Sequence, residues 1–75
     1  MSVYPNPSKG TFTVNVAAPL ADGAVIEVLD ITGKRVYSES LYSLNNTITL
    51  DAEKGLYLVK VITGSKILTQ KLLIH

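Results

Sequence analysis

Side chains that commonly perform catalysis are few and widely spaced in this sequence. There is no cysteine, and the single histidine, His75, is the last residue. A catalytic triad and a thiolate metal site need residue types that are therefore missing. Asp51 and Glu53 are close in sequence, but on an expected turn we interpret them as a solvated corner. We predict that the chain is not an enzyme and uses neither a metal nor another cofactor.

Charge gives no sign of a nucleic-acid partner. Seven Lys and Arg residues face six Asp and Glu residues, for a net charge of +1, and they form no concentrated basic patch. Binding to nucleic acid needs such a patch. No apolar run approaches the ~20 residues of a membrane span, and the start has no signal-peptide pattern. We interpret Met1 as an added residue and residues 1–75 as one domain cut from a larger precursor.

A proline-rich segment at residues 5–10 is the most specific local pattern. Pro5 and Pro7 fix their own φ angles and restrict the residues before them. Asn6 is thereby held extended, with a side chain that can bond nearby backbone, and Gly10 permits the turn into the next strand. We expect a rigid segment, called the entry peptide below, that docks on a sheet edge. The alternative is an ordinary proline-rich turn.

Alternation of apolar and polar residues indicates β-strands along most of the chain. The expected strands cover residues 11–16, 24–29, 35–40, 47–50, 56–63 and 66–74, with a short addition at Val3 and Tyr4. Their expected core-facing residues are Phe12, Val14, Val16, Ala24, Ile26, Val28, Tyr57, Val59 and Val61. Six or seven short strands separated by turn signals are typical of an all-β sandwich or barrel. A single helical turn could form at residues 51–54.

Two spacings sharpen the fold prediction. Asp30 and Gly33 predict a tight turn, because Asp bonds the backbone two residues on and Gly supplies a positive φ. Asp51-x-x-x-Gly55-x-Tyr57-x-Val59 has the form of a tyrosine corner, in which the hydroxyl bonds the backbone a few residues upstream. The alternative is that Tyr57 is a core aromatic at a strand start. The corner favours an antiparallel β-sandwich of the immunoglobulin-like type.

Three segments of the chain, taken in order, carry a family resemblance. Their matching residues are Pro5, Asn6, Pro7 and Gly10 in the first, Asp30, Gly33 and Lys34 in the second, and Gly55, Tyr57, Val59, Gly64, Lys71, Leu72, Leu73 and Ile74 in the third. With these residues the chain resembles the type A C-terminal sorting domain of proteins secreted through the type IX (Por) secretion system of Bacteroidota. The resemblance covers essentially the whole chain.

The resemblance implies a fold, a function and a set of partners. Members of the family form an immunoglobulin-like β-sandwich at the extreme C-terminus of a precursor. The domain directs the cargo fused upstream of it across the outer membrane through the type IX translocon, so that the cargo is secreted or reaches the cell surface. A sortase-like cysteine peptidase then usually removes the domain. By the same resemblance, residues 71–74 in the terminal strand form part of the recognition signal.

The terminal strand also suggests a way of binding a partner. At a sheet edge its backbone groups would be open to strand addition by a partner, or to weak pairing between copies of the chain. Lys71 at such an edge would oppose unspecific pairing. The alternative function is an accessory binding module, carbohydrate-binding or adhesive, of an extracellular protein. Tyr4, Tyr37, Tyr42 and Tyr57 could then stack on sugars, although we favour core and strand packing for all four.

Overall fold

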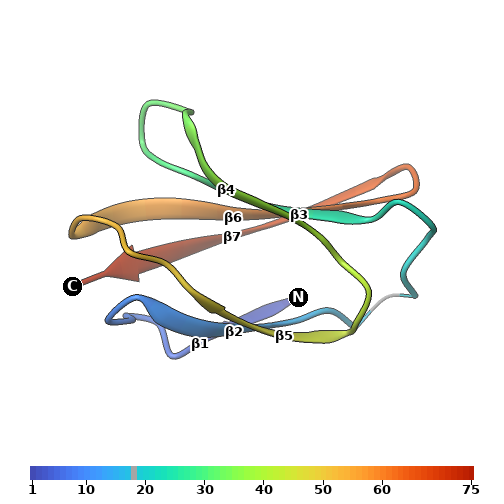
Figure 1. The fold of residues 1–75 in the computed structure, drawn as a ribbon, viewed down its shortest axis with the longest axis horizontal. Helices are drawn as coiled ribbons and strands as arrows, with labels where there is room; N and C mark the ends of the chain where they lie inside the picture. The colour runs from blue at the N-terminus through green and yellow to red at the C-terminus, as the bar shows by residue number, and fades with distance from the viewer. Residues whose placement is uncertain (18) are drawn as a thin grey trace.

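The computed structural model describes residues 1–17 and 19–75, which form two antiparallel β-sheets packed face to face (Figure 1). The strands are β1 (Ser2–Tyr4), β2 (Thr11–Asn15), β3 (Val25–Leu29), β4 (Arg35–Ser40), β5 (Asn45–Thr49), β6 (Gly55–Thr63) and β7 (Lys66–Ile74). One sheet has the order β1-β2-β5 and the other the order β4-β3-β6-β7. This division of strands is that of an immunoglobulin-like sandwich, so the predicted all-β fold is confirmed. The described residues include no helix long and apolar enough to cross a membrane.

The strand boundaries follow the apolar alternation closely, with one displacement. β4 and β7 have the predicted bounds, and β1, β2, β3 and β6 differ by one residue at one end. The prediction was wrong for β5, which covers Asn45–Thr49 instead of residues 47–50, and no helical turn forms at residues 51–54. The asparagines that open β5 pair with β2, and the Asn15 side chain donates a hydrogen bond to that of Asn45. Cross-strand pairing therefore outweighs the low β-propensity of asparagine.

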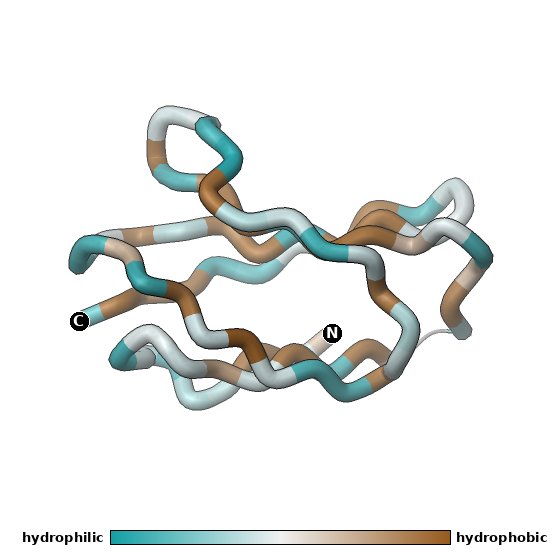
Figure 2. Tube along the Cα trace, viewed as in Figure 1, coloured by the Kyte–Doolittle hydropathy of each residue, from teal (hydrophilic) through white to brown (hydrophobic). Residues whose placement is uncertain are grey.

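The core lies between the two sheets and is built from alternate residues of the strands. Hydrophobic and hydrophilic positions follow each other along most of the trace (Figure 2). The buried apolar residues include Phe12, Val14, Val16, Ala24, Ile26, Val28, Tyr57, Val59, Val61, Leu72 and Ile74. All the residues predicted to face the core are among them. Burial of one large apolar side chain contributes roughly 1.5–3 kcal/mol, so the contact between the sheets is the main source of stability.

A tyrosine corner closes the connection between β5 and β6. The Tyr57 hydroxyl donates to the Glu53 carbonyl at 2.6 Å, and Tyr57 itself is only 8% exposed. The predicted corner is therefore confirmed. Val59, two residues further along, is fully buried. An apolar side chain thus occupies the position at which antibody domains carry a disulfide-bonded cysteine.

Replacing Tyr57 by phenylalanine tests the contribution of the corner. The ring keeps its packing, whereas the Glu53 carbonyl loses its hydroxyl donor in a partly buried position. We expect Tyr57→Phe to lower the free energy of unfolding by about 1–2 kcal/mol, measured by urea denaturation. Tyr42→Phe is the matched control, because Tyr42 is 90% exposed, and its unfolding midpoint should not change. Equal midpoints for the two variants would contradict a stabilising corner.

Candidate functional site

β7 is an edge strand of the four-stranded sheet, and the entry peptide docks on its outer edge (Figure 1). The Ser8 amide donates to the Leu73 carbonyl at 2.8 Å, and the His75 amide donates to the Ser8 carbonyl at 2.8 Å. Ser8 thereby forms a parallel bridge with Ile74. The expectation that the entry peptide docks on a sheet edge is confirmed. That edge belongs to the last strand. Sequence patterns alone did not indicate which sheet edge the entry peptide would contact.

The side chain of Asn6 extends this contact by two residues along β7. Its Nδ2 donates to the Lys71 carbonyl at 2.8 Å, and its Oδ1 accepts from the Leu73 amide at 3.0 Å. The carboxamide therefore bonds β7 in the way that a backbone peptide group of a neighbouring strand would. Only an amide side chain offers a donor and an acceptor in this arrangement. Aspartate would lose the donor, and glutamine carries its amide on a longer stem.

Ser8 and Gly10 hold the entry peptide in its docked shape. Ser8 is 1% exposed, and its hydroxyl donates to the Thr11 carbonyl and accepts from the Gly10 amide. Gly10 has a φ of 116°, and a Cβ there would lie 2.9 Å from the carbonyl oxygen of Leu50. A larger residue at position 10 would be strained and would also collide with backbone. Two constraints therefore require the predicted glycine at position 10: its positive φ and the close approach of the Leu50 carbonyl oxygen.

The Asp30 turn is organised around one carboxylate oxygen. Oδ1 of Asp30 accepts from the amides of Thr32 and Lys34 at 2.9 and 3.0 Å and from the Thr32 hydroxyl at 2.6 Å. Gly33 has a φ of 86°, as the predicted tight turn requires. The hydrogen bond from the Thr32 hydroxyl is the main cause that holds the pKa of Asp30 below its ordinary value, and the two amides add to it.

The Asp30 turn and β7 meet at a shallow hollow on the outer face of the four-stranded sheet. The hollow has a volume of about 120 Å³ and a mostly apolar lining. It is lined by Asp30, Ile31, Leu56, Tyr57, Leu58 and Lys71. Ile31 is 80% exposed, and Leu56 and Leu73, which are paired across β6 and β7, are each exposed by more than two fifths. We name Ile31, Leu56, Leu58 and Leu73 the outer-face patch.

The four residues predicted at the end of β7 divide into two pairs by direction. Leu72 and Ile74 are buried between the sheets, at 0% and 3% exposure. Lys71 and Leu73 are exposed on the outer face. The pleat of a strand imposes this alternation. The inward pair anchors β7 in the core, and the outward pair is accessible to a partner.

The remaining candidate residues do not share this surface. Gly64 lies in the hairpin between β6 and β7, at the opposite end of the sandwich from the C-terminus (Figure 1). Val59 is fully buried. The sequence interpretation did not single out Ser8, Ile31 or Leu56, whose roles depend on which segments meet in space. The signal for Ile31 was a large apolar residue inside a polar turn.

The family comparison covers the same segments. A model of the family described as "Secretion system C-terminal sorting domain" matches residues 2–75. No curated protein matches the chain. The matched range contains the entry peptide and the Asp30 turn, each of which meets β7 towards the C-terminal end of the sandwich.

Removing the Asn6 side chain tests whether it seals the edge of β7. We expect Asn6→Ala to make the Leu73 amide exchange with solvent at least about tenfold faster, because its acceptor is lost. Amide hydrogen exchange followed by NMR measures this. Asn15→Ala is the matched control, since Asn15 bonds Asn45 in the other sheet, and it should leave Leu73 unchanged. Unchanged exchange at Leu73 in Asn6→Ala would show that the side chain does not protect the edge.

The lowered pKa of Asp30 predicts a pH dependence of its turn. A carboxyl whose pKa is lower in the folded state stabilises that state above its ordinary value of 3.8, and the stabilisation is lost as the pH falls through the lowered pKa. The amide NMR shifts of Thr32 and Lys34 should therefore move only in acid. Asp30→Asn keeps the side-chain oxygen without the titrating group and should abolish that movement. A movement that persists in Asp30→Asn would assign the titration to another group.

Proposed function

The chain belongs to the C-terminal sorting domain family of the type IX secretion system, and from this premise we propose that it sends a fused cargo across the outer membrane. In this proposal the domain ends a larger precursor, and the cargo lies upstream of Tyr4. The cargo is secreted or displayed at the cell surface after a sortase-like cysteine peptidase removes the domain. The observation that supports the proposal most strongly is the family match over residues 2–75.

The geometry supports a mechanism of recognition without chemistry. The translocon would contact the outward side chains of β7, Lys71 and Leu73, together with the adjoining outer-face patch. An exposed apolar surface of this kind is a common feature of protein interaction sites. Leu72 and Ile74 would act indirectly, because their burial fixes the direction of their neighbours. A recognition domain of this type needs a fixed surface and no catalytic residue.

The position of the N-terminus suits a fused cargo. β1 leads from the N-terminus into the entry peptide, so the N-terminus lies at the end of β1 remote from the docked segment (Figure 1). A cargo joined to the start of β1 would therefore leave the outer-face patch uncovered. Along the chain, β1 and the whole entry peptide separate the point of cargo attachment from the candidate recognition surface.

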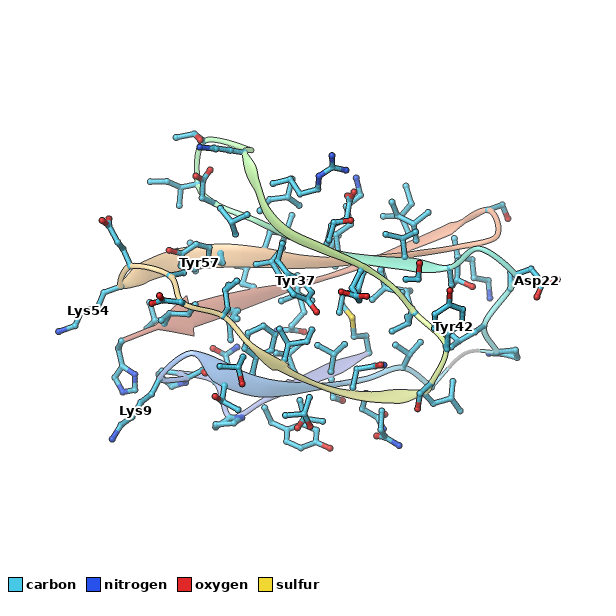
Figure 3. All side chains as sticks on the ribbon, viewed as in Figure 1. Lys9, Asp22, Tyr37, Tyr42, Lys54 and Tyr57 are labelled. Atoms are coloured by element: carbon cyan, nitrogen blue, oxygen red, sulfur yellow. The ribbon has the colours of Figure 1, made fainter. Side chains whose placement is uncertain are left out.

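The alternative of a sugar-binding module gains little support from the tyrosines. Tyr57 is buried in the core and Tyr37 is half-buried, as expected, whereas the expectation of packing was wrong for Tyr42, which is 90% exposed. Tyr42 lies at the end of the sandwich opposite Lys9 and Lys54 (Figure 3). Tyr4 is 50% exposed in β1 of the other sheet. The two exposed rings therefore lie on different elements and form no common platform.

A secretion assay tests the proposed function. The chain is fused to the C-terminus of a fluorescent reporter that carries a signal peptide, in a bacterium with a type IX system. We expect the reporter to reach the cell surface or medium and to remain in the periplasm when residues 71–75 are deleted. Export of the truncated fusion would contradict a sorting role for β7.

A folded variant separates recognition from folding. Leu56→Ser combined with Leu73→Ser changes only exposed parts of the outer-face patch, and Leu44→Ser is the control, because Leu44 is similarly exposed, at 44%, before β5. We expect the double variant to retain the reporter in the periplasm and the control to export it. Urea denaturation of both purified chains checks that they fold. Normal export of a folded double variant would exclude the outer-face patch as the recognition surface.

A further inference from the structure

The outer edge of β7 is divided at Lys71. Towards the C-terminus, Leu73 and His75 direct their backbone groups to the entry peptide. Backbone groups of a strand point to the same side at every second residue. Ile67 and Thr69 therefore direct their amides and carbonyls outward, and so does the amide of Lys71. Among the described residues, no hydrogen bond reaches these outward groups of Ile67 and Thr69.

An extended backbone is the chemical group that complements this open edge. Donors and acceptors alternate along an extended backbone at the same spacing as along the edge of β7. The open part of that edge extends over about 14 Å, from residue 67 to residue 71. The segment ends where the Asn6 side chain already occupies the Lys71 carbonyl. A strand added to β7 would therefore cover residues 67–71 and stop against the entry peptide. Side chains alone would not match such a row of groups.

The charged side chains of β6, β7 and their hairpin are all basic. Residues 55–75 contain Lys60, Lys66 and Lys71 and no acidic residue, so their formal charge is +3 while that of the remaining chain is 4 − 6 = −2. Lys60 lies directly opposite Thr69 in the sheet. Glu27 pairs with Lys60 across β3 and β6, and Arg35 already holds its carboxylate at 2.8 Å. Asp30 faces Lys71 across the hollow but is bonded within its own turn.

We propose that the open edge of β7 binds an extended acidic segment of a partner protein as an additional strand. The acidic side chains of that segment lie over Lys60 and Lys71 on the outer face. A second copy of the chain fits less well, because its own β7 edge carries no acidic side chain to place over Lys60 and Lys71. The proposal rests on the proposed function in one respect, that the partner belongs to the secretion apparatus.

Synthetic peptides test the edge directly. One peptide alternates valine with glutamate over about nine residues, and its counterpart replaces every glutamate by lysine. We expect the glutamate peptide to protect the amides of Ile67, Thr69 and Lys71 from hydrogen exchange in the 75-residue chain, and this effect to weaken with added salt. Equal binding of the lysine peptide, or protection elsewhere only, would overturn the proposal. Protection that grows with protein concentration and without peptide would assign the edge to a second copy instead.

Two pairs of variants separate backbone pairing from charge. Thr69→Pro removes an outward amide and leaves the hydrogen bonds between β7 and β6 intact, so the affinity for the glutamate peptide should fall about tenfold. Thr69→Val keeps the amide and should keep the affinity. Lys71→Glu should also weaken binding. Its control is Lys54→Glu, since Lys54 lies in the loop before β6. Loss of binding in both members of a pair, or in neither, would contradict the assigned edge.

The secretion assay distinguishes this proposal from the proposed function. A Thr69→Pro fusion that folds should remain in the periplasm, whereas the Thr69→Val fusion should be exported. If both are exported while deletion of residues 71–75 still blocks export, the sorting function stands and strand addition at this edge is wrong. If the deletion also fails to block export, the sorting function through β7 is wrong as well.

Discussion

The docking of the entry peptide on β7 is the interaction on which the candidate site depends. Asn6 and Ser8 together bond the backbone of Lys71, Leu73 and His75. An edge strand that ends a chain is normally subject to fraying, because only one neighbour holds it. Here the last residues have a neighbour on each side. The direction of the Lys71 and Leu73 side chains is consequently fixed up to the end of the strand.

This contact joins the two sheets as well as the two ends of the sequence. The entry peptide connects β1 to β2 in one sheet, while β7 belongs to the other. Leu72 and Ile74 pack between the sheets, so the same strand is held by its edge and by its inner face. The Asp30 turn adds a third constraint on the outer face, where it lines the hollow beside Lys71. Parts of all three segments of the family resemblance thus meet at the C-terminal half of β7.

Local patterns in the sequence were sufficient for the fold and insufficient for the site. The alternation of apolar and polar residues predicted the strands and the core, and the spacing around Tyr57 predicted the tyrosine corner. Both predictions succeeded because each depends on a pattern within one segment of the sequence. The start of β5 could not be predicted in this way, since Asn45 joins the strand through its partner Asn15. Asn6 was recognised as held extended, with a side chain able to bond backbone. Its partners lie at separations of 65 and 67 residues, which no local pattern contains.

The same arrangement makes the candidate recognition surface a property of the folded state. In an unfolded chain, Leu72 and Leu73 are equally exposed, and nothing distinguishes an inward from an outward side chain. The sandwich creates the distinction by burying Leu72 and leaving Leu73 exposed. Among the described residues, it also leaves the outward backbone groups of Ile67 and Thr69 and the amide of Lys71 without a hydrogen bond, whereas Asn6 and Ser8 cover the edge from the Lys71 carbonyl onward. A partner that requires this combination of open backbone, lysines and apolar patch would therefore discriminate folded domains from unfolded ones without any catalytic step.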